Sequence, residues 1–187
     1  MACFALFATT IGACGIAWEG DAVVATHLPE RTEAGTAARL LARTPALAAN
    51  ARATPAAAQP RSIRRAIADM TVLLEGAPAD LRSISCDLTT VEPFAQRVYG
   101  IARDIPPGTT CSYGEIAERL GDKQLARSVG TALGRNPLPI IVPCHRVVGA
   151  DGKLTGFSAH GGLETKLKML AIEGAAIGGT PDLFAGR

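Results

Sequence analysis

The segment Pro143-Cys144-His145 places a nucleophilic side chain directly before a base. A cysteine thiol titrates at about 8.5, and a neighbouring histidine is a common means of obtaining the reactive thiolate at neutral pH. Because Pro143 cannot donate a hydrogen bond within a sheet, the apolar runs 136–142 and 147–148 predict a strand that ends or turns at the cysteine. In a plain strand, Cys144 and His145 would point to opposite faces, so the imidazole needs a turn or a bridging water to take the thiol proton. A buried structural cysteine is the alternative that this pair alone leaves open.

A carboxylate lies downstream, on a helix that could bring it to the same site. Residues 156–162 form a glycine-rich loop that suits close approach of the backbone to a flat ligand, and a helix is predicted after it. Its predicted core stripe is Leu163, Leu167 and Leu170. Glu173 follows one turn later on nearly the same face, where its charge opposes the helix dipole by about 0.3–1 kcal/mol. A hydrogen bond from His145 would rationalise this carboxylate, and a solvated last turn is the alternative.

Three helices are predicted upstream of the cysteine. The first runs from Pro93 to Ala102, and its apolar face is Phe94, Val98 and Ile101. After Pro106-Pro107-Gly108 breaks this helix, Ser112 and Glu115 have the spacing of a capping box that opens a helix over 113–120. The third helix, about Lys123 to Leu133, has Leu125, Val129, Ala132 and Leu133 facing inward and Lys123, Arg127 and Thr131 facing outward.

The last two helices and their tight turn are typical of helix-turn-helix proteins, and also of packing units that bind no nucleic acid. Gly130 costs about 1 kcal/mol relative to alanine inside a helix. A gap beside Arg127 would let the helix backbone come close to a groove of DNA, and close helix packing is the alternative. A turn over 149–152 is predicted to form a wing.

The first half of the chain predicts a small α/β unit that contains no catalytic constellation. Residues 1–28 have the pattern of a hairpin, 37–60 are helical or loose, and 63–74 form an amphipathic segment. Prolines make irregular backbone the expectation over 46–60. A boundary near 87–90 divides the chain into an N-terminal α/β domain, residues 1–90, and a mostly helical C-terminal domain, residues 91–187.

Composition is that of an ordinary globular protein. The 187 residues are 48% hydrophobic and 19% charged, enough to bury a core, and the net charge of +2 is weak evidence for a nucleic-acid partner. Five cysteines without CxxC spacing favour reduced thiols in the cytoplasm over disulfides. The apolar N-terminus lacks the basic region of a signal peptide, and no segment predicts a membrane span.

Five stretches of the chain together resemble the O6-methylguanine-DNA methyltransferase family, in its order and spacing. They are Tyr113, Ala126-Arg127-Ser128-Val129-Gly130, Asn136-Pro137-Leu138-Pro139-Ile140, Pro143-Cys144-His145-Arg146-Val147 and Glu173-Gly174. The resemblance covers roughly residues 91–175, whereas the first half matches only in the hairpin. It implies an RNase-H-like N-terminal domain and a C-terminal winged helix-turn-helix domain whose second helix enters the minor groove of DNA. The loop 156–162 is longer than the Gly-Tyr-Ala-Gly-Gly form common in bacterial members, which leaves the alkyl-size preference open.

By the same resemblance, the residues with catalytic roles are Cys144, His145, Glu173, Tyr113 and Asn136. Those that would contact DNA are Arg127, Ser128, Tyr113, Lys123 and Thr131, and those that would line the alkylguanine pocket are Pro139, Val147, Phe157 and Ser158. Cys144 would accept the alkyl group of O6-alkylguanine, and also of O4-alkylthymine, irreversibly and once per molecule. Glu173, His145 and a water would relay the thiol proton. Arg127 would take the place of the flipped base, because a thiol cannot reach O6 inside a duplex.

The remaining implied roles concern the departing base. Tyr113 would crowd the phosphate to drive rotation and would donate a proton to the guanine. Asn136 would brace the turn that presents Cys144. The carbonyls of Cys144 and Val147 would accept the guanine amine, Ser158 would face O6 through its amide, and Pro139 would line the pocket wall.

No cofactor and no metal is expected, because Cys3, Cys14, His27 and Cys86 lack the spacing of a zinc site. The expected protein is a monomer in a bacterial cytoplasm, associated with the nucleoid when it is bound to damaged double-stranded DNA. One rival function is a winged-helix protein that binds alkylated DNA without catalysis, although the family's binding-only members replace the cysteine. The other is a Cys-His hydrolase or acyltransferase, which would need a third residue to orient His145, an oxyanion hole and repeated turnover.

Overall fold

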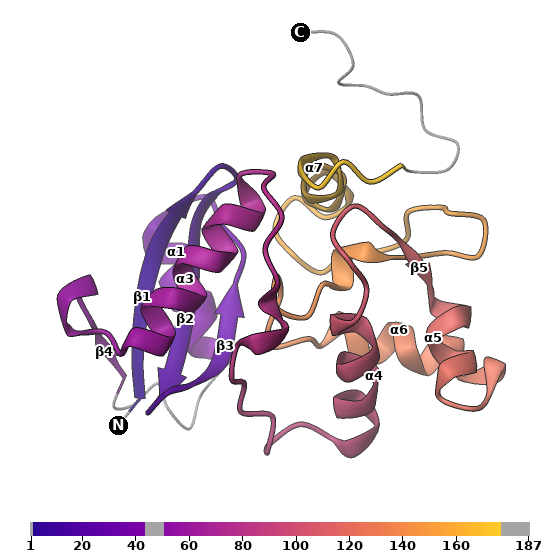
Figure 1. The fold of residues 1–187 in the computed structure, drawn as a ribbon, viewed down its shortest axis with the longest axis horizontal. Coiled ribbons are helices and arrows are strands. Elements are labelled where there is room, and N and C mark those ends of the chain that lie inside the picture. Colours follow the sequence, from indigo (N-terminus) through magenta and orange to yellow (C-terminus); the bar gives the residue numbers. More distant parts are fainter. Residues whose placement is uncertain (1, 44–50, 177–187) are drawn as a thin grey trace, which may run out of the picture.

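The structure, a computed structural model, describes residues 2–43 and 51–176, and its first elements form a sheet between two helices (Figure 1). The strands are β1 (Ala2–Thr9), β2 (Gly12–Glu19), β3 (Ala22–His27) and β4 (Arg52–Ala53), and the helices are α1 (Glu33–Ala42) and α3 (Arg61–Leu74). The strand order is β3-β2-β1-β4, with β4 parallel to β1 and the other pairs antiparallel. The predicted hairpin and the predicted amphipathic segment 63–74 are confirmed. The prediction for 46–60 lies in part outside the described residues.

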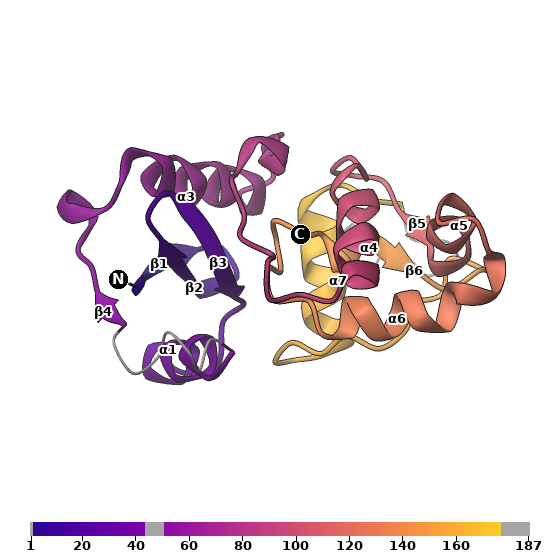
Figure 2. The ribbon, with the colours of Figure 1, turned by 90° about the horizontal axis from the view of Figure 1, so that it is seen from below.

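Strand β2 is buried on both faces because its side chains alternate between large and small. Ile16 and Trp18 belong to the main core cluster with Met70 of α3. Ala17, one residue out of phase, packs with Leu40 of α1. Figure 2 shows α3 on one side of the sheet and α1 on the other. The period of two thus sets which helix each residue of the strand meets.

The second group of elements is mostly helical. Its members are α4 (Pro93–Arg103), β5 (Cys111–Ser112), α5 (Tyr113–Arg119), α6 (Ala126–Gly134), β6 (Val147–Val148) and α7 (Leu163–Ile172). The capping box is confirmed: the Glu115 N–H donates to Ser112 Oγ at 3.1 Å, and the Ser112 N–H donates to Glu115 Oε2 at 2.6 Å. A 3-10 turn over 123–125 leads into α6, which ends at Gly134 as predicted. The predicted α/β first half and helical second half are therefore confirmed.

The strand predicted before Pro143 is wrong. Residues 136–142 form successive turns, and only the two residues of β6 are extended after the cysteine. Pro137 and Pro139 explain this, since neither can donate to a sheet. The turns also hold Ile140 at φ +78°, a left-handed conformation that β-branched residues rarely adopt. The segment before the cysteine is therefore compact and strained rather than extended.

The predicted core stripe of α7 is confirmed at Leu170 and wrong at Leu163. Leu163 is 42% exposed and Leu167 only partly buried, whereas the residues buried by this helix are Lys166, Met169 and Leu170. The spacing of 166, 169, 170 and 173 defines a face that turns toward the cysteine segment. The spacing of the leucines did not predict this face because one of its buried residues is a lysine, whose Nζ is hydrogen-bonded to carbonyl oxygens, as described below.

The apolar face of α4 is rotated by about one residue from the prediction. Its buried residues are Val98, Tyr99 and Ala102, while Phe94 and Ile101 are partly buried. The Tyr99 hydroxyl donates to the Ala132 carbonyl at 2.8 Å, which ties α4 to α6. A buried tyrosine needs such a partner, and this bond fixes the rotation of the helix.

The two groups of elements meet along β3, whose Thr26 binds the segment before the cysteine. The Thr26 N–H donates to the Pro137 carbonyl at 2.9 Å, and Thr26 Oγ1 donates to the Pro139 carbonyl at 2.6 Å. Arg43 adds a third bond, from Nη1 to the Asn136 carbonyl at 2.6 Å. The turns that precede Cys144 are therefore held by the N-terminal half. Among the described residues, no helix has the length and apolar character to cross a membrane.

Candidate active site

A single 3-10 turn, Cys144–Arg146, presents the cysteine and its neighbours. The Cys144 N–H donates to the Val142 carbonyl, and the Arg146 N–H donates to the Pro143 carbonyl. The chain then enters β6, where Val147 pairs with Cys111 of β5. Pro143 therefore ends one local structure and starts another, and the turn that the Cys-His pair requires is present.

Asn136 holds the turns in front of the cysteine. Its Nδ2 donates to the Val142 carbonyl at 2.8 Å, and its Oδ1 accepts from the Leu138 N–H at 2.9 Å. Both ends of one buried amide are thus used within 136–142. This satisfies backbone groups that a strand would otherwise have paired.

His145, Arg146 and Glu173 form a buried cluster behind the cysteine. His145 Nε2 lies 2.9 Å from Glu173 Oε1. Arg146 donates from Nε to Oε2 at 2.9 Å and from Nη2 to Oε1 at 2.8 Å, a bidentate pair. The Glu173 side chain is 3% exposed. Glu173 is thus in contact with the segment that carries the cysteine, rather than in a solvated last turn.

The charges of this cluster determine which histidine nitrogen can act as a base. Burial alone would raise the pKa of Glu173, but the hydrogen bonds from His145 and Arg146 outweigh it and lower the pKa to about 2. Burial lowers the pKa of His145, against the opposing effect of Glu173. An ionised carboxylate can only accept, so the neutral imidazole carries its proton on Nε2. Nδ1, which is buried without a hydrogen-bond partner in the described part of the chain, keeps its lone pair.

The cysteine itself is a protonated thiol in this setting. Burial raises the pKa of Cys144, and a hydrogen bond with Asn136 and the nearby charges of Lys166 and Arg43 only partly offset this. The sequence had suggested that the histidine lowers the thiol pKa. The raised pKa is the opposite of that expectation, and His145 Nδ1 is an unpartnered acceptor in the described part of the chain.

Lys166 is a buried charged residue beside the cysteine segment that the sequence pattern missed. Its side chain is fully buried, and its Nζ donates to the Val147 carbonyl at 2.6 Å and the Thr155 carbonyl at 3.5 Å. Burial lowers the pKa of Lys166 to about 8, against an opposing effect of Cys144. Its position seven residues before Glu173, two helical turns, was the available signal.

Tyr113 begins α5 and lies against α6. A Cβ built on Gly130 would stand 3.7 Å from two ring atoms of Tyr113, an ordinary van der Waals contact, so this ring does not require a glycine here. The Thr155 hydroxyl donates to the Tyr113 hydroxyl at 3.1 Å, across to the loop after β6. Packing inside the protein therefore does not explain Gly130.

The predicted outward face of α6 is exposed. Arg127, Ser128 and Thr131 project from this helix, and Lys123 lies in the turn before it. Lys123 Nζ is 2.9 Å from Glu118 Oε1, in a pair exposed to solvent. Because Lys123 is paired with Glu118, Arg127 is the main cationic side chain of this face.

A small cavity of about 20 Å³ adjoins Cys144. Its walls include three of the predicted pocket residues, Pro139, Phe157 and Ser158. Val147 is fully buried and is not part of this wall. The remaining lining residues are His27, Leu28, Arg43, Leu133, Asn136 and Ala159. The first three come from the N-terminal half, and sequence patterns gave no signal for them.

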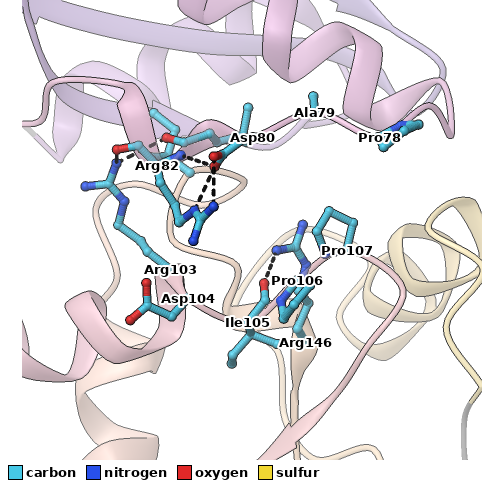
Figure 3. A pocket seen from close by; sticks show the side chains of 12 residues that line it. Pro78, Ala79, Asp80, Arg82, Arg103, Asp104, Ile105, Pro106, Pro107 and Arg146 are labelled. Atoms are coloured by element: carbon cyan, nitrogen blue, oxygen red, sulfur yellow. Dashed lines mark hydrogen bonds and ion pairs between the residues drawn. The ribbon is translucent and has the colours of Figure 1, made fainter.

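A larger cavity of about 290 Å³ lies elsewhere and does not include Cys144 (Figure 3). It is lined by the linker near Asp80 and Arg82, by the end of α4 near Arg103, and by Arg146. Figure 3 shows Arg146 donating to the Ile105 carbonyl, a bond of 2.5 Å. This cavity reaches the buried cluster only through Arg146 and is separate from the cysteine. Within residues 2–43 and 51–176, no group of three or more metal-ligating side chains comes together.

Comparison with known proteins gives matches in sequence. A family profile described as "6-O-methylguanine DNA methyltransferase, DNA binding domain" matches residues 93–175. The methylated-DNA–protein-cysteine methyltransferase of Mycolicibacterium paratuberculosis is 46% identical over 114 residues, which are 61% of this chain and 67% of that protein. The enzyme of the same name from Mycobacterium leprae is 53% identical over 91 residues, 49% of this chain and 53% of that protein. The sequence matches therefore span about half to two thirds of these relatives.

The structural match is longer. The crystal structure of Mycobacterium tuberculosis OGT in complex with DNA superposes with a TM-score of 0.69 at 32% identity, over 91% of this chain and 92% of that one. The resemblance seen in the sequence is confirmed. Since the structural match covers nine-tenths of both chains and the matched profile includes the cysteine turn, this chain belongs to the O6-methylguanine-DNA methyltransferase family, the methylated-DNA–protein-cysteine methyltransferases.

Proposed function

We propose that this chain repairs O6-alkylguanine, and also O4-alkylthymine, in duplex DNA by moving the alkyl group irreversibly to Cys144. The observation that carries the assignment to this cysteine is the arrangement behind it. A protonated thiol is followed in the same 3-10 turn by a neutral histidine, whose Nε2 is held by the ionised Glu173 and whose Nδ1 is unpartnered among the described residues. Such a histidine has a free lone pair on Nδ1 and can act as a general base.

The proposed reaction is an in-line displacement. A water between Cys144 Sγ and His145 Nδ1 carries the thiol proton to the imidazole, and Glu173 stabilises the imidazolium that forms. The sulfur–carbon bond forms as the carbon–O6 bond breaks, and its electron pair stays on the guanine. Tyr113 gives the departing base a proton and is left as a phenolate, which regains a proton through solvent as the His145 imidazolium loses one. Overall, one proton passes from the thiol to the base. The thioether is stable, and each chain reacts once.

DNA is the proposed partner of the exposed face of α6. Arg127 would enter the stack in place of the flipped base, with Ser128, Thr131 and Lys123 against the minor-groove backbone. For Lys123 this requires exchange of its surface pair with Glu118 for a phosphate, which is inexpensive because exposed ion pairs contribute only about 0–1 kcal/mol. Gly130 would let the helix backbone approach the groove.

The pocket roles remain part of the same proposal. Pro139, Phe157 and Ser158 would enclose the base beside Cys144. The Val147 carbonyl already accepts from Lys166, so its second lone pair would take the guanine amine. Asn136 would keep the turn rigid during attack. The family resemblance also supports four further proposals. They are the domain division at residue 90, the winged form of the second domain, a monomeric state and a location in a bacterial cytoplasm.

A Cys-His hydrolase or acyltransferase is the second candidate, because Glu173 supplies the third residue that orients such a histidine. Turnover separates the two. With excess O6-methylguanine duplex, the proposed function predicts that product stops at one methyl per chain and that Cys144→Ser forms none. Product that continues to rise, or an active Cys144→Ser variant, would overturn the proposal. A protein that retains the duplex without any methyl transfer would instead be a non-catalytic binder.

A further inference from the structure

The cavity beside Cys144 is too small for the base that the proposed function would bring to it. Its volume of about 20 Å³ accommodates about one water, for which roughly 10–15 Å³ suffices. A flipped alkylguanine can enter only if a wall moves. Which wall moves, and what holds it, therefore bears on the alkyl groups that the site accepts.

The two walls come from opposite halves of the molecule. On one side are His27 and Leu28, at the end of β3, and on the other are Phe157, Ser158 and Ala159 of the loop before α7. Strand β3 belongs to the central sheet, whereas the loop has no regular structure and joins α7 through two glycines with positive φ. The loop is the wall that can be displaced, with Gly161-Gly162 as its hinge.

One contact between a histidine and a carboxylate ties this loop to the N-terminal half, and it is an ion pair when the histidine is protonated. His160 Nδ1 lies 3.6 Å from Glu30 Oε2. The His160 main chain is anchored at the other end, because Thr165 Oγ1 of α7 donates to its carbonyl at 2.6 Å. Figure 2 shows the loop before α7 reaching toward the β3–α1 side of the molecule. The contact therefore spans the boundary between the halves beside the cavity.

The carboxylate of Glu30 is held ready for this contact. Its Oε1 is 3.1 Å from His27 Nε2, and its own N–H donates to Thr36 Oγ1 at 3.0 Å. Burial lowers the pKa of His27, and the charges of Arg43 and Arg39 act in the same direction, so this histidine stays neutral. The side chain of Glu30 is 20% exposed and that of His160 is 43% exposed. Both side chains of the pair are therefore partly exposed to solvent.

We propose that Glu30 and His160 form a latch that holds the loop 156–162 over Cys144, and that this latch limits transfer of bulky alkyl groups more than transfer of methyl. Both are positioning residues, since neither lines the cavity wall. The proposal rests on the proposed function, because selectivity between alkyl groups presupposes transfer to Cys144. A methyl group needs the smallest displacement of the loop, whereas a benzyl group needs the largest.

The test compares Glu30→Gln and His160→Gln with the wild type on duplexes that carry O6-methylguanine or O6-benzylguanine. Because a partly exposed ion pair shifts an equilibrium by about two- to fivefold, each variant should raise the benzyl-to-methyl rate ratio by that factor. The double variant should show no further increase, since either substitution already breaks the pair. Glu33→Gln is the matched control: it removes the same charge three residues away, from an exposed position in α1, and should leave the ratio unchanged.

A second readout does not depend on alkyl transfer from DNA. The rate at which iodoacetamide labels Cys144, measured on the cysteine peptide, should rise in Glu30→Gln and His160→Gln and stay at the wild-type value in Glu33→Gln. If the wild type labels in this way but transfers no methyl, the proposed function fails while the labelling rates still decide the latch. Equal rates in all three variants, or effects of the two latch substitutions that add in the double variant, would overturn the latch.

Discussion

Loss of the Glu173 carboxylate should destabilise the folded chain strongly, because three hydrogen bonds converge on this one buried group. His145 supplies one and Arg146 supplies two. Glu173→Gln keeps the shape of the side chain and removes its charge. The amide that replaces one oxygen also turns a donor toward the donors around it, so Arg146, which is 5% exposed, is left as a buried cation without its carboxylate.

Two routes give the size of the effect. Removing one partner of a buried ion pair costs about 3–5 kcal/mol. The interval between the ordinary pKa of 4.5 and the folded value of about 2 corresponds to about 3 kcal/mol, at about 1.4 kcal/mol for each pKa unit. We therefore expect the free energy of unfolding to fall by about 3 kcal/mol in Glu173→Gln. Tm should fall by about 6–12 °C, since 1 kcal/mol shifts a chain of this length by about 2–4 °C.

The pH dependence separates this effect from a general packing defect. Because the pKa of Glu173 is lower in the folded than in the unfolded chain, its stabilisation is complete above about pH 4.5 and is lost as the pH falls toward 2. Urea unfolding of wild type and variant at a series of pH values measures this. The difference between the two proteins should be about 3 kcal/mol at pH 7 and should shrink below pH 4.5.

Glu164→Gln is the matched control, because Glu164 lies in the first turn of the same helix and is exposed. It should cost less than about 1 kcal/mol, the range of a helix-dipole interaction. A free energy of unfolding for Glu173→Gln within 1 kcal/mol of the wild-type value at pH 7 would refute the reasoning. So would a difference that stays constant into acid.

Three other substitutions test separate parts of the account. Arg127→Ala should slow transfer from an alkylated duplex about tenfold or more, since flipping costs a few kcal/mol, but leave the reaction with free O6-benzylguanine nearly unchanged; equal losses would contradict its role. Gly130→Ala should raise the free energy of unfolding by up to about 1 kcal/mol, because alanine favours a helix and the new Cβ meets the Tyr113 ring at an ordinary 3.7 Å. The same substitution should weaken transfer from duplex DNA. Unchanged transfer would show that Gly130 does not approach the DNA. The pKa of Lys166 is lowered from 10.5 to about 8 in the folded wild type, so the unfolded chain binds more protons between these pH values and the free energy of unfolding should rise there. Lys166→Met should abolish that rise. An identical pH profile in both proteins would contradict the lowered pKa.

Local patterns predicted the parts of this molecule that depend on neighbouring residues. The capping box at Ser112, the exposed face of α6 and the turn at Pro143 each follow from residues within one or two turns of each other. The same holds for the antiparallel pairing of β2 with β3, which was predicted as a hairpin within residues 1–28. These features are set by backbone chemistry and local spacing, and the structure bears them out.

Features set by distant partners were not predictable in the same way. Lys166 can be buried because the Val147 carbonyl accepts a hydrogen bond from its Nζ, and no helical pattern contains that carbonyl. Arg43 reaches Asn136 across 93 positions in the chain. The wall that His27 contributes to the cavity likewise exists only after the halves dock. Burial of a charged side chain violates the pattern that locates a core, so such residues are found only when the fold is known.

The central claim is that one thiol among five accepts the alkyl group. The most direct measurement is peptide mass spectrometry of the protein after reaction with a duplex that contains one O6-methylguanine. The account predicts a single methyl on the peptide that contains Cys144, and none on the peptides with Cys3, Cys14, Cys86 or Cys111. A methyl on another cysteine, or an unmodified protein after the duplex has lost its methyl, would contradict it.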